Sequence, residues 1–301
     1  MFEYIRNVKM NYSFYNGQDN YSDGEIEDEL LDIVKNKYNI GQILKEDRRW
    51  PILYHLSPTR HNLLEWFPFN KNGNVLEIGA GCGAITGLLC EKTKSVTCIE
   101  LSKKRALINA YRHLDQANLE IIIGNLNDIE LTKKYDYITL IGVLEYAAVY
   151  TDTNSPYLSF LNNIKDYLKE DGVLIVAIEN KFGLKYWAGS REDHTGEFFD
   201  SIQNYPSSRK ISTFTRFELE NLLKIVGFEK VSFYYPYPDY KLPTQIYSDD
   251  RLPCIGEIKS QNYNYDQSRM VLFDEESVMN NIIQNDLFSV FSNSYLVFCS
   301  V

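Results

Sequence analysis

Short apolar runs alternate with segments of helical periodicity over most of the chain after residue 73. Runs of roughly four to eight apolar, often β-branched residues are typical of strands, whereas apolar residues three or four positions apart predict helices. The predicted strands are 75–78, 96–100, 119–123, 135–141, 173–178, 229–235 and 294–301. Strands that alternate with helices favour a parallel sheet built from βαβ units.

The helices expected around these strands complete an α/β pattern. Their ranges are 23–36, 58–66, 84–91, 102–116, 155–169 and 216–226. Ser102 is a suitable N-cap, Asp171-Gly172 is expected to stop the helix that starts at 155, and Gly227 to end the last helix. The sequence therefore predicts an α/β fold with a seven-stranded, mostly parallel sheet.

Three segments depart from the alternation. Residues 1–73 precede the sheet and are expected to form an N-terminal helical lid or extension to a main domain at 74–301. Within that domain, 179–213 and 236–292 are two long insertions. Loops of this length in a compact domain usually serve as lids or caps, so we expect both insertions to be functional.

Composition and charge exclude several classes of protein. The 301 residues carry a formal net charge of −10 and no long run of Lys or Arg, which disfavours nucleic acid as a partner. Five cysteines without zinc-type spacing indicate reduced thiols, and no metal site is expected. The start MFEYIRNVKM lacks an apolar signal segment, and no stretch is apolar enough to span a membrane. We expect a cytoplasmic protein; its oligomeric state stays open.

The most informative motif, NVLEIGAGCGAITGLL, places Gly79, Gly81 and Gly83 between a predicted strand and a helix. Glycine lets the backbone approach a ligand because it has no Cβ. The same stretch also fits the dinucleotide pattern G-x-G-x-x-A, through Gly79, Gly81 and Ala84, and Glu100 could hold the ribose of either S-adenosylmethionine or NAD. Glu77 separates the two cofactors: its carboxylate would repel a pyrophosphate but suits a ligand with an ammonium and a sulfonium.

Five segments together resemble the class I S-adenosylmethionine-dependent methyltransferases. They are VLEIGAGCG, VTCIELS, IIIGNLNDI, YDYITLIGVLEY and GVLIVAIEN, in the order and spacing of that family. The resemblance covers 74–180, 213–235 and 294–301. It implies a Rossmann-like sheet whose last strand is antiparallel, and S-adenosylmethionine as the cofactor.

The resemblance also implies which residues hold the methionine and ribose of the cofactor. The turn that would lie against these groups contains Gly79, Gly81 and Gly83. Glu77 would support the methionine end, and Glu100 would hold the ribose hydroxyls.

Further cofactor contacts follow from the same resemblance. Gly142 would lend a carbonyl near the ammonium. Asn125 stands where the family commonly has an acid that meets the adenine amino group, and its amide oxygen can accept the same hydrogen bond. Arg60, by resemblance to methyltransferases with an N-terminal lid, would pair with the cofactor carboxylate; an ordinary ion pair is the alternative.

The acceptor side offers three candidate bases. A hydroxyl acceptor benefits from a base, whereas a neutral amine needs little help. His194, in the first insertion, is a candidate that Asp193 could orient or charge; an exposed loop histidine without a role is the alternative. Glu145 and Glu179, after the fourth and fifth strands, are alternative bases or partners for backbone groups. His113 is expected to be a solvated residue on its helix.

The segment FYYPYPDYKLPTQIY, which begins at Phe233, alternates aromatic residues with proline and favours an extended rim. Its tyrosines could stack on a sugar ring, or seal the second insertion onto the sheet. With YHLSPTR, GVLEYA and ENKFGLKYWAGSREDHTG, it resembles a bacterial subgroup associated with surface polysaccharides. That resemblance implies O-methylation of a sugar or glycan precursor. A non-catalytic cofactor-binding partner subunit and an NAD-dependent oxidoreductase are the alternatives.

Overall fold

The computed structural model divides the chain into two compact units. The described residues are 1–19, 22, 24–207, 210–259 and 267–301. The first unit contains Met1–Leu140 and Ile164–Leu174, and the second contains Ile141–Asn163 and Ile175–Val301. None of the helices in these described ranges has the length and apolar character needed to cross a membrane.

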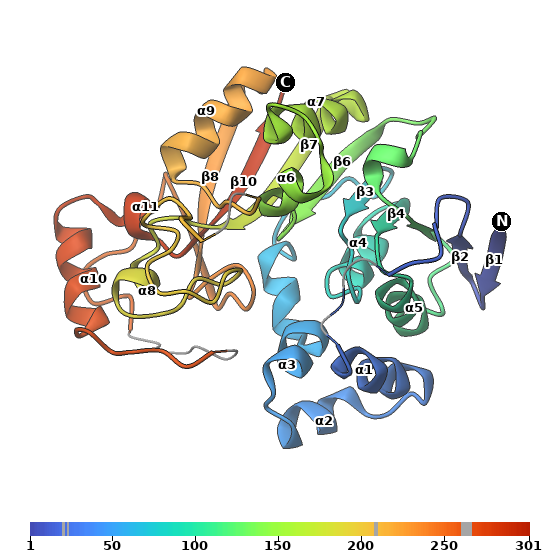
Figure 1. Cartoon of the computed structure of the whole chain (residues 1–301), viewed down its shortest axis with the longest axis horizontal. Helices are drawn as coiled ribbons and strands as arrows, with labels where there is room; N and C mark the ends of the chain where they lie inside the picture. The colour runs from blue at the N-terminus through green and yellow to red at the C-terminus, as the bar shows by residue number, and fades with distance from the viewer. Residues whose placement is uncertain (20–21, 23, 208–209, 260–266) are drawn as a thin grey trace. The chain divides into compact units, whose positions relative to one another are not determined.

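The first unit is organised around parallel strands (Figure 1). Its strands are β1 (Phe2–Ile5), β2 (Val8–Asn11), β3 (Asn74–Ile78), β4 (Ser95–Glu100), β5 (Leu119–Ile123) and β6 (Tyr135–Ile141). They are ordered β1-β2-β5-β4-β3-β6, and only β1 and β2 pair antiparallel among these described strands. In this register Glu77 of β3 lies opposite Cys98 of β4. The predicted parallel βαβ arrangement is confirmed here.

The first residues of the chain extend this sheet, which corrects the prediction of a helical lid over all of 1–73. β1 and β2 form a hairpin, and β2 pairs in parallel with β5. Val8 and Met10 are fully buried while Lys9 is not, so β2 has one face in the core. A strand of four residues carries too few alternations to stand out in the sequence.

The helices after the hairpin belong to the core of the first unit. They are α1 (Ile26–Lys35), α2 (Ile40–Glu46), α3 (Trp50–Leu56), η1 (Pro58–Leu63), α4 (Thr86–Lys92), α5 (Lys103–Arg112) and η2 (Leu126–Asp128). α1 lies beside α5 (Figure 1). Leu30 of α1 and Ile52 of α3 form one buried cluster with Ile108 of α5. The N-terminal helices are therefore packed on the βαβ core of this unit.

The second unit holds the end of the chain. β7 (Leu168–Glu179) and α7 (Pro156–Asp166) run across the unit boundary. The other elements are η3 (Leu144–Tyr146), α6 (Ala147–Tyr150), α8 (Leu184–Trp187), α9 (Arg216–Val226), β8 (Lys230–Tyr237), β9 (Gln245–Ser248), α10 (Glu275–Gln284), α11 (Phe288–Phe291) and β10 (Ser294–Ser300). The strand order is β7-β10-β8-β9, and β10 pairs antiparallel with β8. The predicted antiparallel last strand is confirmed, and the structure adds β1, β2 and β9 to the predicted strands.

Several predicted boundaries need correction. The helix expected at 155–169 ends at Asp166, and Asp171-Gly172 lies inside β7. In place of the α-helix predicted at 58–66, Pro58–Leu63 forms a short 3₁₀ helix. α5 starts after its predicted cap Ser102 but ends at Arg112, not at 116. Asp23, the predicted start of the first helix, lies outside the described residues.

The insertions contain short elements and much irregular chain. Residues 208–209 of the first insertion and 260–266 of the second lie outside the described residues. Three tyrosines of the predicted aromatic rim, Tyr235, Tyr240 and Tyr247, are buried, which supports their sealing role rather than stacking on a sugar. Among the cysteines, Cys254 is exposed and the other four are buried, with no disulfide.

Candidate active site

The glycine turn after β3 has the backbone conformation that its sequence requires. Gly79, Gly81 and Gly83 have φ angles of 68°, 54° and 75°, values that residues with a side chain rarely adopt. The Gly79 N–H donates to the carbonyl of Ile99 at the end of β4, at 2.8 Å. A Cβ built on Gly81 would meet no atom within 4 Å. The turn is thus open at Gly81, as a ligand that lies against it would need.

Gly83 lacks a side chain for a different reason. A Cβ there would overlap Oδ1 of Asn109 on α5 and lie 2.9 Å from Cε1 of His113. Close packing of the turn on α5 therefore accounts for this glycine without a ligand.

His113 is partly buried in this packing and is not the solvated residue that the sequence predicted. Its Nδ1 lies 2.8 Å from Oδ1 of Asn109, and burial lowers its pKa to about 3.

Glu77 of β3 lies in a buried polar cluster. Its Oε2 accepts hydrogen bonds from the Thr86 hydroxyl at 2.6 Å and the Cys98 thiol at 3.2 Å. Asn109 donates to the same Thr86 hydroxyl at 3.0 Å. Burial raises the pKa of Glu77 to about 7, and the hydrogen bonds from Thr86 and Cys98 oppose the rise. A cationic group bound beside this carboxylate would favour its charged form, which fits the methionine end of S-adenosylmethionine.

Glu100 joins the glycine turn to the start of α5. Its Oε2 accepts from the Gly81 N–H at 2.7 Å, and its Oε1 accepts from the Ser102 N–H at 2.9 Å. Burial raises its pKa, while these backbone donors favour the carboxylate. Glu100 therefore holds the open turn in place; its contact with a ribose remains a prediction.

The other predicted cofactor residues have structural surroundings of their own. Arg60 is 3% exposed, lies 4.6 Å from the ring centroid of Tyr54, and its charge favours ionised Glu77. Oδ1 of Asn125 caps η2 by accepting from the Asn127 N–H at 3.1 Å.

Gly142 belongs to the second unit. It has a φ of 69°, and a Cβ there would lie 2.7 Å from the hydroxyl of Tyr240. That close approach accounts for a glycine at this position without a ligand.

The N-terminal loop after β2 contributes contacts that the sequence did not predict. The Asp19 carboxylate accepts from the Lys103 N–H at the start of α5, at 2.8 Å. A Cβ on Gly124, directly after β5, would lie 2.8 Å from Cβ of Phe14. These contacts join segments about 80 to 110 residues apart, so no local pattern could reveal them.

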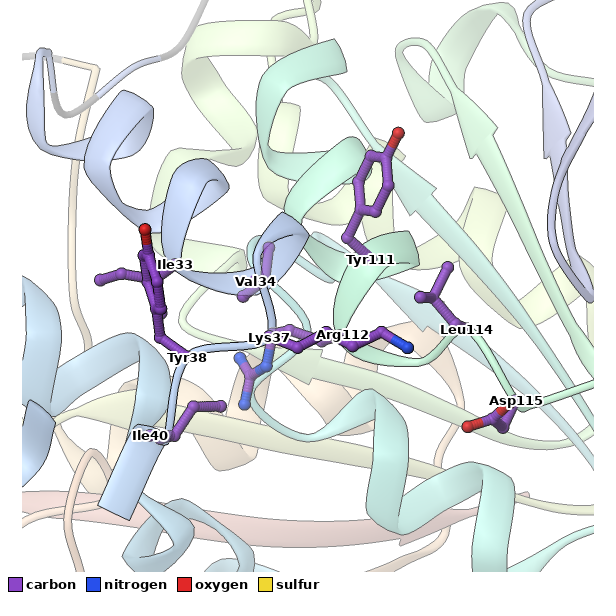
Figure 2. A pocket seen from close by; sticks show the side chains of 9 residues that line it. All are labelled: Ile33, Val34, Lys37, Tyr38, Ile40, Tyr111, Arg112, Leu114 and Asp115. Carbon is purple, nitrogen blue, oxygen red and sulfur yellow. The ribbon is translucent and has the colours of Figure 1, made fainter. Parts of the chain in front are cut away.

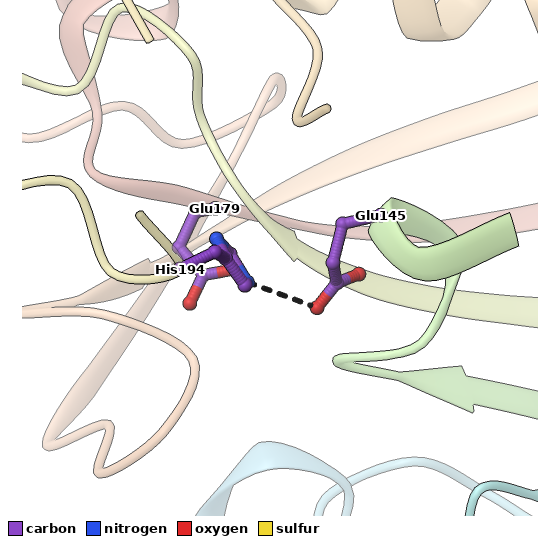
Figure 3. Close-up of side chains that lie close together, drawn as sticks. All are labelled: Glu145, Glu179 and His194. Carbon is purple, nitrogen blue, oxygen red and sulfur yellow. Dashed lines mark ion pairs between the residues drawn. The ribbon is translucent and has the colours of Figure 1, made fainter. Parts of the chain in front are cut away.

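In the second unit, the three candidate bases come together (Figure 3). Glu145 lies in η3, Glu179 ends β7, and His194 lies in the first insertion. Nε2 of His194 is 3.4 Å from Oε1 of Glu145 and 3.9 Å from Oε2 of Glu179, and the three side chains are 6% exposed or less. His194 is therefore not an exposed loop histidine.

Glu192, rather than the predicted Asp193, orients this imidazole. Nδ1 of His194 lies 3.0 Å from Oε1 of Glu192, whose Oε2 accepts from the Thr195 N–H at 2.8 Å. The hydroxyl of Tyr205 donates to Glu192 at 3.1 Å. Burial alone would lower the pKa of His194, but the surrounding carboxylates raise it well above its usual value.

Asp193 belongs to an adjoining ion-pair network. It lies 2.7 Å from Lys185 and 2.5 Å from Lys241. Lys185 also lies 3.6 Å from Asp239, and Lys241 lies 2.5 Å from Glu179. The lysines were not predicted as site residues, because isolated lysines in long insertions carry no recognisable spacing.

A family model described as a methyltransferase domain matches residues 47–232, more than half of the chain. The chain belongs to this family. It is an S-adenosylmethionine-dependent methyltransferase, and S-adenosylmethionine is its cofactor. The family assignment decides against an NAD-dependent oxidoreductase.

Relatives of this methyltransferase are named for different methyl acceptors. It is 22% identical over 236 residues to a ribosomal RNA small subunit methyltransferase A of Fusobacterium nucleatum, covering 75% of this chain and 86% of the relative. It is 31% identical over 72 residues to a malonyl-[acyl-carrier protein] O-methyltransferase of Priestia megaterium, covering 23% of this chain and 26% of that one. A solved DhpI–SAH complex is 15% identical with a TM-score of 0.46, covering 90% of this chain and 96% of that chain.

Proposed function

We propose that this methyltransferase transfers a methyl group to a hydroxyl of a sugar or glycan precursor. The observation that carries the proposal is the buried Glu145–Glu179–His194 group. A hydroxyl is a weak nucleophile until it loses its proton, whereas a neutral amine is not. A buried group of two carboxylates and an imidazole can take up the proton that a hydroxyl acceptor must lose.

The residues of this chain then have separate tasks. S-adenosylmethionine supplies a methyl group already activated on a sulfonium, so the protein chiefly has to hold and orient the reactants. Gly81 leaves space at the turn, and Glu77 and Glu100 bind the cationic and ribose parts. The Glu145 carboxylate, whose Oε2 has no hydrogen-bond partner among the described residues, accepts the proton of the hydroxyl.

The sugar class rests on sequence resemblance to the polysaccharide-associated subgroup. The buried tyrosines of the aromatic rim do not add to it. The names of the relatives suggest ribosomal RNA or malonyl-[acyl-carrier protein] as other acceptors. The net charge of −10 argues against RNA, because RNA binding depends on cationic side chains that neutralise phosphates.

The deciding experiment measures S-adenosylhomocysteine release against sugar nucleotides, glycans, small amines, small-subunit ribosomal RNA and malonyl-acyl carrier protein. We expect turnover with a member of the sugar classes, and a methyl ether in the product by mass spectrometry. Turnover confined to the amines, the RNA or the acyl carrier protein would overturn the proposal.

His194→Ala tests the acceptor group. We expect turnover to fall roughly 10²- to 10⁴-fold, the usual range for loss of acid–base assistance, because the imidazole lies 3.4 Å from the proton acceptor Glu145. The dissociation constant of S-adenosylmethionine should stay within about twofold, since the candidate cofactor residues Glu77, Gly81 and Glu100 belong to the other unit. Exposed Glu229→Gln serves as a control in the same unit. Wild-type turnover by the His194 variant would show that the Glu145–Glu179–His194 group takes no part in methyl transfer.

A further inference from the structure

We propose that Glu145, Glu179 and His194 form a binding site for a divalent transition-metal cation. Each side chain offers one ligand atom, and these atoms all lie within 4.8 Å of one another (Figure 3). Two carboxylate oxygens and one imidazole nitrogen at such distances can converge on a cation about 2.0–2.2 Å from each. Sequence analysis predicted these residues only as candidate bases, because ligands 34 and 15 residues apart form no recognisable metal-binding motif.

The imidazole is held in the orientation that a metal ligand requires. Nδ1 of His194 faces Oε1 of Glu192 at 3.0 Å, which leaves Nε2 directed at Glu145 and Glu179. Metal-bound histidines almost always donate their other N–H to a carboxylate, carbonyl or water. Glu192 itself accepts a hydrogen bond from the hydroxyl of Tyr205, which orients this second partner.

The charge balance of the buried cluster calls for a further cation. Lys185 and Lys241 face Asp193 and Asp239, together two positive and two negative charges. What remains is three carboxylates, Glu145, Glu179 and Glu192, against one imidazole, although Lys241 also contacts Glu179. Buried carboxylates that lack a counter-charge are strongly unfavourable, so a divalent ion is well placed here.

An unsatisfied buried oxygen gives independent support. Oε2 of Glu145 is buried and has no hydrogen-bond partner among the described residues, and this side chain is 1% exposed. Native structures rarely leave such an atom without a ligand, water or ion. A carboxylate has two oxygens, so Glu145 can bind a cation through one and accept a proton through the other.

The ligand set selects the class of cation. Imidazole suits Zn²⁺ and Fe²⁺, while carboxylates also suit Mn²⁺, so a mixed set favours these ions over Ca²⁺. Three protein ligands leave a position for the oxygen of an acceptor hydroxyl. That last role rests on the proposed function; cation binding does not.

The test titrates Mn²⁺ into the full chain after EDTA treatment and follows free Mn²⁺ by electron paramagnetic resonance. We expect one Mn²⁺ per chain with a dissociation constant below about 100 µM, displaced by Zn²⁺. His194→Ala and Glu145→Gln should weaken binding at least 10-fold, and Glu192→Gln about 10- to 100-fold. Glu229→Gln, an exposed glutamate of the same unit, should bind as the wild type does.

A measurement on the wild-type protein covers the case in which a variant fails to fold. With ¹⁵N-histidine labelling, bound Mn²⁺ should show a hyperfine coupling to one imidazole nitrogen. Absence of saturable binding, or binding without that coupling and unchanged by the ligand variants, would overturn the proposal. If Mn²⁺ binds but no hydroxyl acceptor is methylated, the proposed function is overturned and the cation site is not. If a sugar is methylated without any bound cation, the cation site is overturned and the proposed function is not.

Discussion

Two glycines of the turn after β3, Gly81 and Gly83, have different surroundings. Gly81 faces open space, whereas Gly83 lies against Asn109 of α5. Both have positive φ angles. The sequence motif treats them as equivalent, so only the structure separates the position open to a ligand from the one that packs on the fold.

Gly81→Val should abolish binding of S-adenosylmethionine. The added side chain would enter the open space beside the turn, and a φ of 54° is unfavourable for a β-branched residue. The measurement is the rise in melting temperature on adding S-adenosylmethionine. Gly256→Val is the matched control, since Gly256 also has a positive φ and open surroundings. If S-adenosylmethionine raises the melting temperature of the Gly81 variant as much as that of the wild type, the cofactor does not bind against this turn.

Glu77→Gln should stabilise the cofactor-free protein at high pH. The pKa of Glu77 in the folded protein, about 7, exceeds the 4.5 of a solvent-exposed glutamate, so the folded state binds the proton more tightly. Stability contributed by Glu77 is therefore present below pH 4.5 and is lost as pH rises through 7. Glu77→Gln should therefore raise the free energy of unfolding by about 3 kcal/mol at pH 9 and change it little at pH 4.5. The figure follows from the pKa difference between folded and unfolded states, at 1.36 kcal/mol per pKa unit.

Urea denaturation at pH 5 and pH 9 measures this difference. Glu91→Gln, an exposed glutamate of the same unit, is the control and should change stability little at either pH. A Glu77 variant with the same stability change at both pH values would show that burial does not disfavour the charge of this carboxylate.

At the scale of elements, local signals explain which predictions succeeded. β5 and β6 have the predicted bounds. α9 begins directly after its N-cap Thr215, which forms a capping box with Glu218, and ends before its C-cap Gly227, whose φ is 92°. β2 has too few residues for a pattern. The Asp171-Gly172 pair reads as a stop signal, yet it lies within β7, because pairing in the sheet overrides local turn preference.

Thr215→Ala tests the cap of α9. The Thr215 hydroxyl accepts from the Glu218 N–H at 3.2 Å, and the Glu218 carboxylate accepts from the Thr215 N–H at 2.8 Å. Loss of an N-cap side chain typically destabilises by about 1 kcal/mol. Urea denaturation should show this loss, while Thr215→Ser should retain most of the stability because serine offers the same oxygen. Equal stability of the alanine and serine variants would mean that the cap contributes nothing.

At the scale of the whole molecule, the sequence could place the candidate cofactor residues on one turn, but it could place only part of the buried Glu145–Glu179–His194 group. Glu77, Gly81 and Glu100 lie within one contiguous βαβ segment, where local pattern and spacing carry the information. Glu145 and Glu179 were predicted as candidate bases because each follows a strand. Glu192 was not predicted as the partner of His194, because the sequence cannot tell whether Glu192 or Asp193 faces the imidazole.

The net charge of −10 predicts weak binding to RNA. We expect fluorescence anisotropy with a small-subunit ribosomal RNA fragment to show no saturable binding below about 10 µM at 150 mM salt, since few cations are available to replace counterions. The same assay with S-adenosylhomocysteine present is the control for cofactor-dependent binding. Sub-micromolar, salt-sensitive affinity would instead favour the activity named for the Fusobacterium relative.

The unequal exposure of the cysteines makes the molecule convenient for fluorescence work. Cys254 is exposed, whereas burial raises the pKa of the other four thiols. A maleimide dye reacts with thiolates, so at neutral pH it should attach at one position of the unmodified chain. Cys254 lies in the second insertion, away in sequence from every proposed ligand residue. A single reporter can therefore be placed there without first removing cysteines by mutagenesis.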